Sequence, residues 1–287
     1  MKRPYKSIVL VIGLGQVGSA LFELVKESRT FKVYGVDVDK KKMQEFNQNQ
    51  LPKTVDVMHV CIRCLEQDSF VATTVRYMKQ FNPKLTIINS TVPPRTTEKI
   101  GKQSEGYLAH SPIRGMHKNA ETMKQYLIRL TKYIGGVDSE SAELAQKHFE
   151  ELGLKTKTLS SSMATELAKL FETTYRAWMI SCFQEMHRIS RHFGADFDEV
   201  VDFLEDTHLV RFDRPIMFPD VIGGHCLIPN TELLLKSYES QFLKLILESN
   251  DKRKKEIKNK DVMAEVGKVK QRAKILEEKL CSAENRI

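Results

Sequence analysis

The chain has 287 residues, enough for two average domains, and 41% of them are apolar, an ordinary share for a globular protein. No apolar run approaches the roughly 18 residues that a membrane-spanning helix needs, and the basic N-terminus leads into a short strand-like run instead of a signal peptide. These features predict a cytoplasmic protein that does not enter a membrane. Five cysteines are an odd number in such a chain, which argues against a disulfide framework.

The net charge of +8 is concentrated near the C-terminus, where residues 251–287 hold twelve Lys/Arg against seven Asp/Glu. A basic excess fits a nucleic-acid partner, an anionic small ligand or a solvated surface. Since a charge run is usually a solvated face, a nucleic-acid partner is the less favoured interpretation. The lone pair Cys61 and Cys64 has no second pair to complete a zinc site, so no metal is expected.

Up to about residue 160, strand-like runs alternate with amphipathic stretches. The predicted strands are 8–12, 32–38, 55–62, 85–89, 107–110, 133–135 and 155–159. The predicted helices are 18–26, 40–47, 69–80, 96–103 and 139–152. This alternation predicts an α/β fold, a doubly wound and mostly parallel sheet with helices on both faces.

The pattern becomes helical beyond Ser160. Residues 163–192 contain no proline or glycine and keep a helical period, and further helices are predicted at 196–205 and 231–247. The predicted domains are therefore a Rossmann domain at 1–160, an all-helical domain at 161–250 and a basic helix at 251–287.

The last of these segments has a heptad pattern. Its seam, spaced alternately by four and three residues, consists of Val262, Val266, Val269, Ala273, Leu276, Leu280, Ala283 and Ile287. Such a seam is typical of a coiled coil with a partner helix. The alternatives are a helix packed on its own domain and a fraying basic tail.

A glycine fingerprint follows the first predicted strand. Gly13, Gly15 and Gly18 stand in the G-x-G-x-x-G spacing and enclose Gln16 and Val17 at the start of a helix. In this context the first glycine permits a tight turn, the second lets the backbone approach a pyrophosphate, and the third lets helix and strand pack closely. The free N–H groups of the helix then bind the phosphates, so all five residues are candidates for cofactor binding.

Asp37 ends the second predicted strand, about twenty residues after the fingerprint. A carboxylate at this place binds the ribose hydroxyls and repels a 2′-phosphate, which favours NAD over NADP. The run Lys40, Lys41 and Lys42 follows closely and weakens that preference. Ile62, at the end of the third predicted strand, is counted with the cofactor-binding residues.

Three later segments resemble the UDP-glucose/GDP-mannose dehydrogenase family. Residues 89–97, NSTVPPRTT, are similar to its S-T-V-x-x-G-T-T segment. Residues 166–177, ELAKLFETTYRA, resemble its E-L-A-K-L-x-E-N-T-Y-R-A helix, and residues 223–230, GGHCLIPN, its G-G-H-C-x-x-x-D loop. Together the similarity covers about residues 8 to 245.

The resemblance implies a Rossmann domain followed by a helical domain of the 6-phosphogluconate-dehydrogenase-like type, which pairs two chains through the helix 163–192. The family's third, nucleotide-binding domain would be replaced by the basic heptad helix. The family oxidises the C6 alcohol of a nucleotide sugar to a carboxylate with two NAD, so a small-molecule substrate such as a sugar nucleotide is implied.

The resemblance also implies roles for single residues. Cys226 matches the family's nucleophile, which holds the aldehyde and is oxidised on to a thioester. Lys169 matches the lysine that stabilises the developing oxyanion. Thr91 matches a threonine beside the nicotinamide and the active-site water, and Lys42 a lysine that contacts the cofactor.

This sequence departs from the family at four of these places. Asn230 stands in place of the family's aspartate, Thr173 in place of its asparagine, Ile113 in place of the glutamate associated with thioester hydrolysis, and Cys64 in place of a threonine near the cofactor. Asn230 is a candidate catalytic residue by position, but neither Asn230 nor Ile113 can exchange a proton. His110 or His225 could substitute for them.

Two hypotheses therefore stand side by side. The first is an NAD-dependent oxidoreductase that moves one hydride from an alcohol of a sugar nucleotide or a related anionic molecule, with the full four-electron reaction in doubt. The alternative is a catalytically degenerate module that binds NAD or a nucleotide sugar as a sensor or assembly protein.

Overall fold

The computed structural model describes residues 7–46, 50–115, 119–213 and 215–284, with side chains up to residue 275. The chain divides into two compact units between Leu170 and Phe171, a point that lies inside its longest helix, α7 (Ser162–Phe193). Among the described residues, no helix is long and apolar enough to cross a membrane.

The first unit is built on a seven-stranded sheet with the order β2-β1-β3-β4-β5-β6-β7. Its strands are β1 (Ser7–Ile12), β2 (Phe31–Val36), β3 (Val57–Val60), β4 (Leu85–Ile88), β5 (Tyr107–His110), β6 (Lys132–Gly136) and β7 (Thr156–Thr158). All neighbours run parallel except β5 and β6. The predicted α/β fold with a mostly parallel, doubly wound sheet is thus confirmed.

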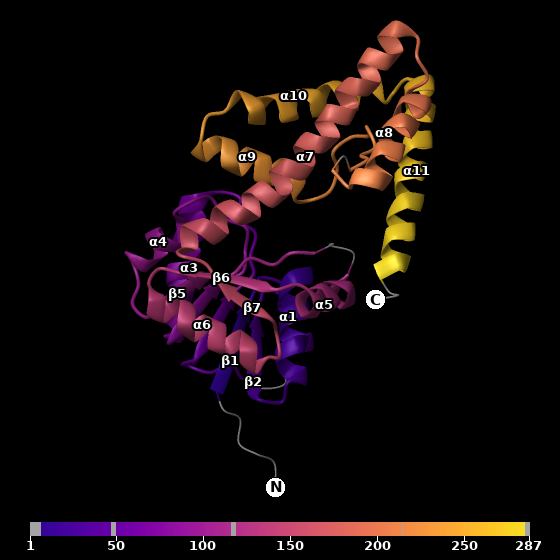
Figure 1. Ribbon diagram of the computed structural model, residues 1–287. Coiled ribbons are helices and arrows are strands. Elements are labelled where there is room, and N and C mark those ends of the chain that lie inside the picture. Colours follow the sequence, from indigo (N-terminus) through magenta and orange to yellow (C-terminus); the bar gives the residue numbers. More distant parts are fainter. Residues whose placement is uncertain (1–6, 47–49, 116–118, 214, 285–287) are drawn as a thin grey trace. The chain divides into compact units, whose positions relative to one another are not determined.

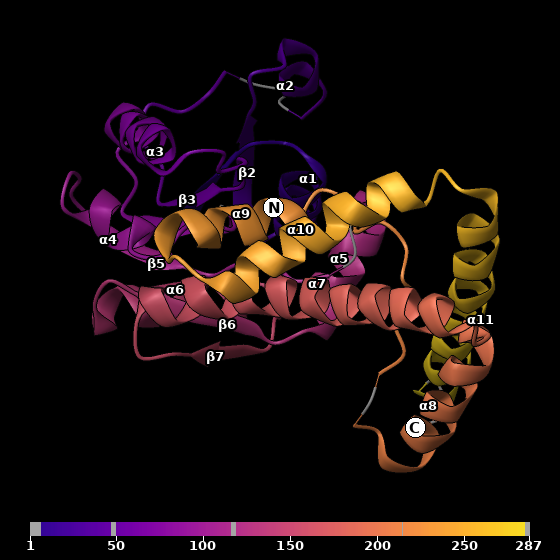
Figure 2. The same ribbon diagram turned by 90° about the horizontal axis from the view of Figure 1, so that it is seen from above.

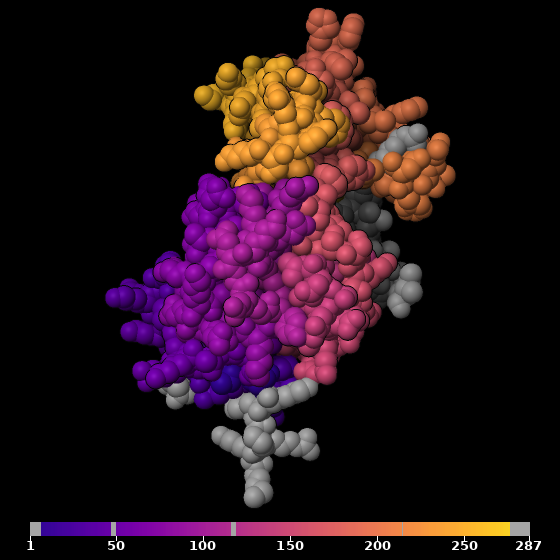
Figure 3. Space-filling model, turned by 90° about the vertical axis from the view of Figure 1, so that its left-hand side faces the viewer, coloured from indigo at the N-terminus to yellow at the C-terminus, as the bar shows by residue number. Residues whose placement is uncertain are grey.

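Six helices surround this sheet (Figure 1). They are α1 (Gln16–Glu27), α2 (Lys40–Phe46), α3 (Gln67–Phe81), α4 (Thr96–Gly101), α5 (Ala120–Arg129) and α6 (Ser139–Glu151). Because successive strand residues point to opposite faces, Val9 packs in one core with residues of α1, α5 and α6, while Leu10 packs in another with residues of α3 and α4. Figure 3 shows the surface of this unit, which is purple to magenta on one side and pink on the other.

Helix α5 is absent from the sequence prediction. It begins at Asn119, whose side chain accepts a hydrogen bond from the Thr122 N–H and so caps the helix. Only Met123 and Leu127 of this helix are buried, so the apolar stripe on which the prediction relied is too narrow to mark it.

The second unit contains the rest of α7 and the helices α8 (Phe197–Arg211), α9 (Leu227–Ser237), α10 (Gln241–Glu256) and α11 (Lys260–Glu284). The helix predicted at 231–247 is therefore wrong in detail, because α9 ends and α10 begins around residues 238–240. Ser240 adopts an extended backbone conformation there, and no glycine or proline marks the break. Figure 2 shows α9 and α10 as a hairpin, and α8 beside α11.

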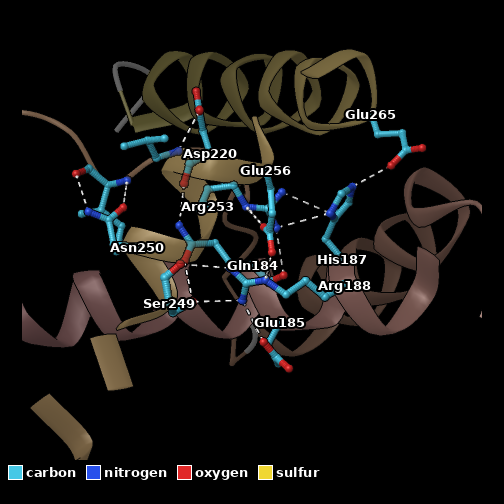
Figure 4. A network of polar contacts seen from close by, with 12 residues as sticks. Gln184, Glu185, His187, Arg188, Asp220, Ser249, Asn250, Arg253, Glu256 and Glu265 are labelled. Carbon is cyan, nitrogen blue, oxygen red and sulfur yellow. Dashed lines mark hydrogen bonds and ion pairs between the residues drawn. The ribbon is translucent and has the colours of Figure 1, made fainter. Parts of the chain in front are cut away.

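Buried polar side chains join α7, α10 and α11 (Figure 4). Arg253 of α10 is fully buried, and its guanidinium donates to the Gln184 carbonyl oxygen and to His187 Nδ1 at 3.0 and 3.2 Å. His187 Nε2 in turn lies 2.8 Å from the Glu265 carboxylate on α11. Since Nδ1 accepts, the proton sits on Nε2, and His187 is a neutral link between two helices.

The first half of the heptad seam is used inside this unit. Val262, Val266 and Val269 are buried, and Val269 packs with Phe183 and Phe197 of α7 and α8. Arg272 strengthens this attachment by binding Asp198, Asp202 and Glu205 of α8. These contacts favour the alternative in which the helix packs on its own domain, while the later seam positions from Leu276 onward lie outside the described side chains.

Candidate functional site

The glycine loop lies between β1 and α1 and has the geometry that the fingerprint requires. Gly13 has a φ of +90°, and a Cβ there would lie 2.9 Å from the Cys61 carbonyl oxygen. A Cβ on Gly18 would lie 1.7 Å from the Gly13 carbonyl oxygen, so helix and loop touch at that point. A Cβ on Gly15 would meet nothing within 4 Å. Gly15 therefore borders open space, as a backbone that receives a pyrophosphate must.

The Asp37 carboxylate stabilises this loop by a direct hydrogen bond. Its Oδ2 accepts the Leu14 N–H at 2.6 Å, and its Oδ1 accepts the Asp39 N–H at 3.0 Å. A carboxylate has about four acceptor positions, and Asp37 is half-exposed, so it retains capacity for ribose hydroxyls.

The other candidate cofactor residues follow the strands next to the loop. Ile62 follows β3 and Thr91 follows β4, both half-buried, and Gln16 and Val17 begin α1. Parallel strands bring their carboxyl ends to one edge, and the order reverses between β1 and β3, which is where ligands bind in such sheets. Lys42 lies further out on α2.

The loop that carries Thr91 is held at its start by its neighbour Ser90. The Ser90 hydroxyl donates to the Ile62 carbonyl oxygen at 2.6 Å, and the Ser90 carbonyl oxygen accepts from His110 Nε2 at 3.1 Å. His110 Nδ1 lies 2.7 Å from the Thr165 hydroxyl of α7. His110 is fully buried with both ring nitrogens engaged, so it is a structural link and not the substitute acid or base considered from the sequence.

The far end of the same loop has an unusual backbone. Arg95 adopts a left-handed conformation with a φ of +68°, at the place where the similar family segment has glycine. Its N–H donates to Glu166 of α7 at 2.7 Å, which offsets part of the strain.

Ile113 does not face solvent at the carboxyl edge. It is 4% exposed and packs in the same core as Met123 and Ile134. The turn before it is held by Lys132, whose Nζ donates to the Ser111 carbonyl oxygen at 2.7 Å. Burial lowers the pKa of Lys132 to about 7. Sequence reasoning missed Lys132, because a lysine in a short strand gives no sign of being buried.

The remaining candidates lie on α7 and in the second unit. Lys169 of α7 is half-buried and belongs to the first unit. In the second unit Cys226 is the N-cap of α9, where the helix dipole stabilises an anion such as a thiolate. One turn later, buried Asn230 donates from Nδ2 to the Thr173 hydroxyl at 3.2 Å. The two departures from the family thus form one neutral pair beside Cys226.

Buried histidines predict an acid-labile first unit. His59 Nε2 lies 2.9 Å from His148 Nε2, and burial lowers the pKa of both, that of His148 to about 4. Burial also lowers the pKa of His110 to about 3. Below pH 6.5 the unfolded chain takes up these protons and the folded chain does not, so the free energy of unfolding falls as the pH drops, by up to about 1.4 kcal/mol per pH unit for each histidine.

Urea unfolding at pH 7 and pH 5 measures this loss. His148→Gln is expected to reduce the pH dependence, whereas His192→Gln, at an exposed position of α7, leaves it unchanged. Equal stability of the unmodified chain at both pH values would contradict the assignment.

Comparisons with known proteins fit this architecture. Residues 163–252 match the model of the UDP-glucose/GDP-mannose dehydrogenase family, central domain. The chain is 27% identical over 284 residues to a UDP-N-acetyl-D-mannosamine dehydrogenase of Methanocaldococcus jannaschii, covering 85% of this chain and 65% of that protein. With a second relative of that description, from Pyrococcus horikoshii, it shares 30% identity over 168 residues, covering 55% and 39% of the two chains.

Solved structures show the same fold. The UDP-D-ManNAc dehydrogenase structure from Pyrococcus horikoshii superposes with a TM-score of 0.73 at 22% identity, covering 86% of this chain and 68% of that chain. A 3-hydroxyisobutyrate dehydrogenase from Mycobacterium tuberculosis superposes with a TM-score of 0.64 at 13% identity, covering 88% and 94%. The fold therefore does not select the substrate. The resemblance to the UDP-glucose/GDP-mannose dehydrogenase family is confirmed by the match of residues 163–252 to its central-domain model and by these relatives.

Proposed function

We propose that this chain is an NAD-dependent oxidoreductase that oxidises an alcohol of a sugar nucleotide to the aldehyde and stops there. The observation that carries the proposal is the glycine loop braced by Asp37 at the carboxyl edge of the sheet, in a chain whose next unit matches a sugar-nucleotide dehydrogenase domain. Relatives that are dehydrogenases of UDP-sugars support the substrate, although the chain spans only 65% of the length of the first of them.

The residues fit the cofactor. Open space over Gly15 and the N–H groups at the start of α1 suit the pyrophosphate, and the Asp37 carboxylate suits the adenosine ribose. NAD, when bound, accepts the hydride. Lys169 stabilises the developing alkoxide, Thr91 orients the reacting groups, and Cys226 holds the aldehyde through its thiolate.

The arrest at the aldehyde rests on the two positions at which the family's glutamate and aspartate are missing. Ile113 is packed in the core, and Asn230 is paired with Thr173, so neither activates a water for hydrolysis of a thioester. A second oxidation would therefore leave the product bound to Cys226 as a thioester, and repeated turnover requires release at the aldehyde. Alcohol and NAD⁺ then give aldehyde, NADH and a proton. One hydride transfer completes this reaction without the missing aspartate and glutamate.

Turnover is tested with NAD and a panel of sugar nucleotides, following the absorbance of NADH. Lys169→Ala is expected to lower kcat by about 100-fold or more, because an oxyanion donor is removed. Cys226→Ala is expected to lower turnover as well, whereas Lys147→Ala on α6 leaves it unchanged. NAD binding without turnover of any sugar would support the alternative, a degenerate module that senses or assembles.

We further propose that two copies pair through α7. Met186, Ile189 and Phe193 form one apolar stripe of α7, with exposed fractions of 37%, 51% and 79%. Met186 and Ile189 also line a cavity of about 400 Å³ between α7 and α10, together with residues such as Trp178 and Leu245. A second copy that covers this stripe removes three exposed apolar side chains of the helix from water.

Light scattering tests this pairing. The unmodified chain is expected to have the mass of two copies, and Ile189→Glu the mass of one, because a charge would be buried at the interface. Phe203→Glu, at an exposed place on α8, is the control that should remain paired. A single-copy mass for the unmodified chain would contradict the proposal.

A further inference from the structure

Glu166 is a fully buried carboxylate with three hydrogen bonds to another part of the chain. Its Oε2 accepts the Arg95 N–H at 2.7 Å, and its Oε1 accepts the Thr97 N–H at 2.8 Å and the Thr97 hydroxyl at 2.6 Å. These donors form the start of α4, whose own N-cap residue provides no side-chain cap. The carboxylate of α7 therefore does the capping, from about 70 residues away along the sequence.

The preceding residue of α7 holds the other end of the same loop. Thr165 contacts His110, and His110 donates to the Ser90 carbonyl oxygen. Thr165 and Glu166 thus fix the first and last residues of the segment 90–95, with Thr91 between them. Lys169 follows one turn later on the same helix, so its position is fixed together with theirs.

We infer that Glu166 is a positioning residue, which holds the Thr91 loop at a set distance from Lys169 and so aligns the nicotinamide end of the site. This inference rests on the proposed function. A carboxylate is required because three donors converge on it, and a glutamine in its place offers one oxygen only and presents an NH₂ group to a neighbouring N–H. The loop would then lose one anchor while the glycine loop and Asp37 stay as they are.

The test compares the binding of NAD and of ADP-ribose, which lacks the nicotinamide, by calorimetry in Glu166→Gln. ADP-ribose affinity is expected to change by less than about twofold, while NAD affinity falls towards that of ADP-ribose. With a sugar nucleotide present, kcat is expected to fall on the order of 10- to 100-fold, because small misplacements of reacting groups are costly. Glu143→Gln, on the exposed face of α6, is the matched control and should change neither quantity.

Thr97→Val is the variant to test if Glu166→Gln does not fold. It removes only the hydroxyl donor, keeps both amide donors, and should move the same ratio in the same direction by a smaller factor. An unchanged ratio of NAD to ADP-ribose affinity in a folded variant, with unchanged kcat, would overturn the role of Glu166. That result would not contradict the proposed function. Failure of the unmodified chain to bind either ligand would contradict the proposed function and with it this role.

Discussion

Gly18→Ala is expected to destabilise the first unit by about 3 kcal/mol and to abolish measurable NAD binding. The added Cβ would lie 1.7 Å from the Gly13 carbonyl oxygen, which is backbone and cannot rotate away. Either the start of α1 or the glycine loop must therefore move, and both form the pyrophosphate site. Urea unfolding and calorimetric titration with NAD measure the two effects.

Gly15→Ala separates binding from folding at the same loop. Its Cβ would meet no atom within 4 Å, and the backbone there has a φ of −73°, which any residue adopts. Stability should therefore stay within about 0.5 kcal/mol, while NAD affinity falls at least about tenfold because the methyl group occupies the place of the phosphates. Unchanged NAD affinity in Gly15→Ala would show that the cofactor does not bind over this loop.

Arg253→Met is expected to lower the free energy of unfolding of the second unit by about 3 to 5 kcal/mol. The guanidinium is fully buried and joins the Gln184 carbonyl oxygen, His187 and Glu256, 3.3 Å away (Figure 4). Methionine fills a similar volume but removes the guanidinium donors from the Gln184 carbonyl oxygen and from His187 Nδ1, while Glu256 keeps its hydrogen bond from Arg188. The loss should appear in urea unfolding monitored by the fluorescence of Trp178, the one tryptophan of the chain.

Lys254→Met is the matched control on the same helix. Lys254 makes an exposed ion pair with Asp251, three residues earlier, and such pairs contribute little. A change of less than about 0.5 kcal/mol is expected. Equal stability of the two variants would contradict the structural role assigned to Arg253.

The sequence predicts the sheet unit well because its signals are local. Each buried strand is a short apolar run, and the glycine spacing follows from backbone geometry, so the amino-acid pattern alone brings Gly13, Gly15, Gly18 and Asp37 into one site. Helix α5 and the break before Ser240 are not predicted, because a two-residue apolar stripe and a turn without glycine or proline leave little mark on a sequence.

Contacts between distant segments cannot be predicted from local sequence patterns. Glu166 lies within one of the family-like segments, yet nothing in its neighbours shows that its carboxylate reaches the amides of Arg95 and Thr97. Likewise Thr173 and Asn230 look like two separate losses in the sequence, whereas in the fold they are one hydrogen-bonded pair. Long-range pairing of polar groups depends on the packed fold and not on local pattern.

The measurement that tests the central claim most directly is the amount of NADH formed for each sugar nucleotide consumed, together with the identity of the product. The claim predicts one NADH for each sugar and an aldehyde that a hydrazide reagent traps. Two NADH for each sugar, with a carboxylate as the product, would contradict it.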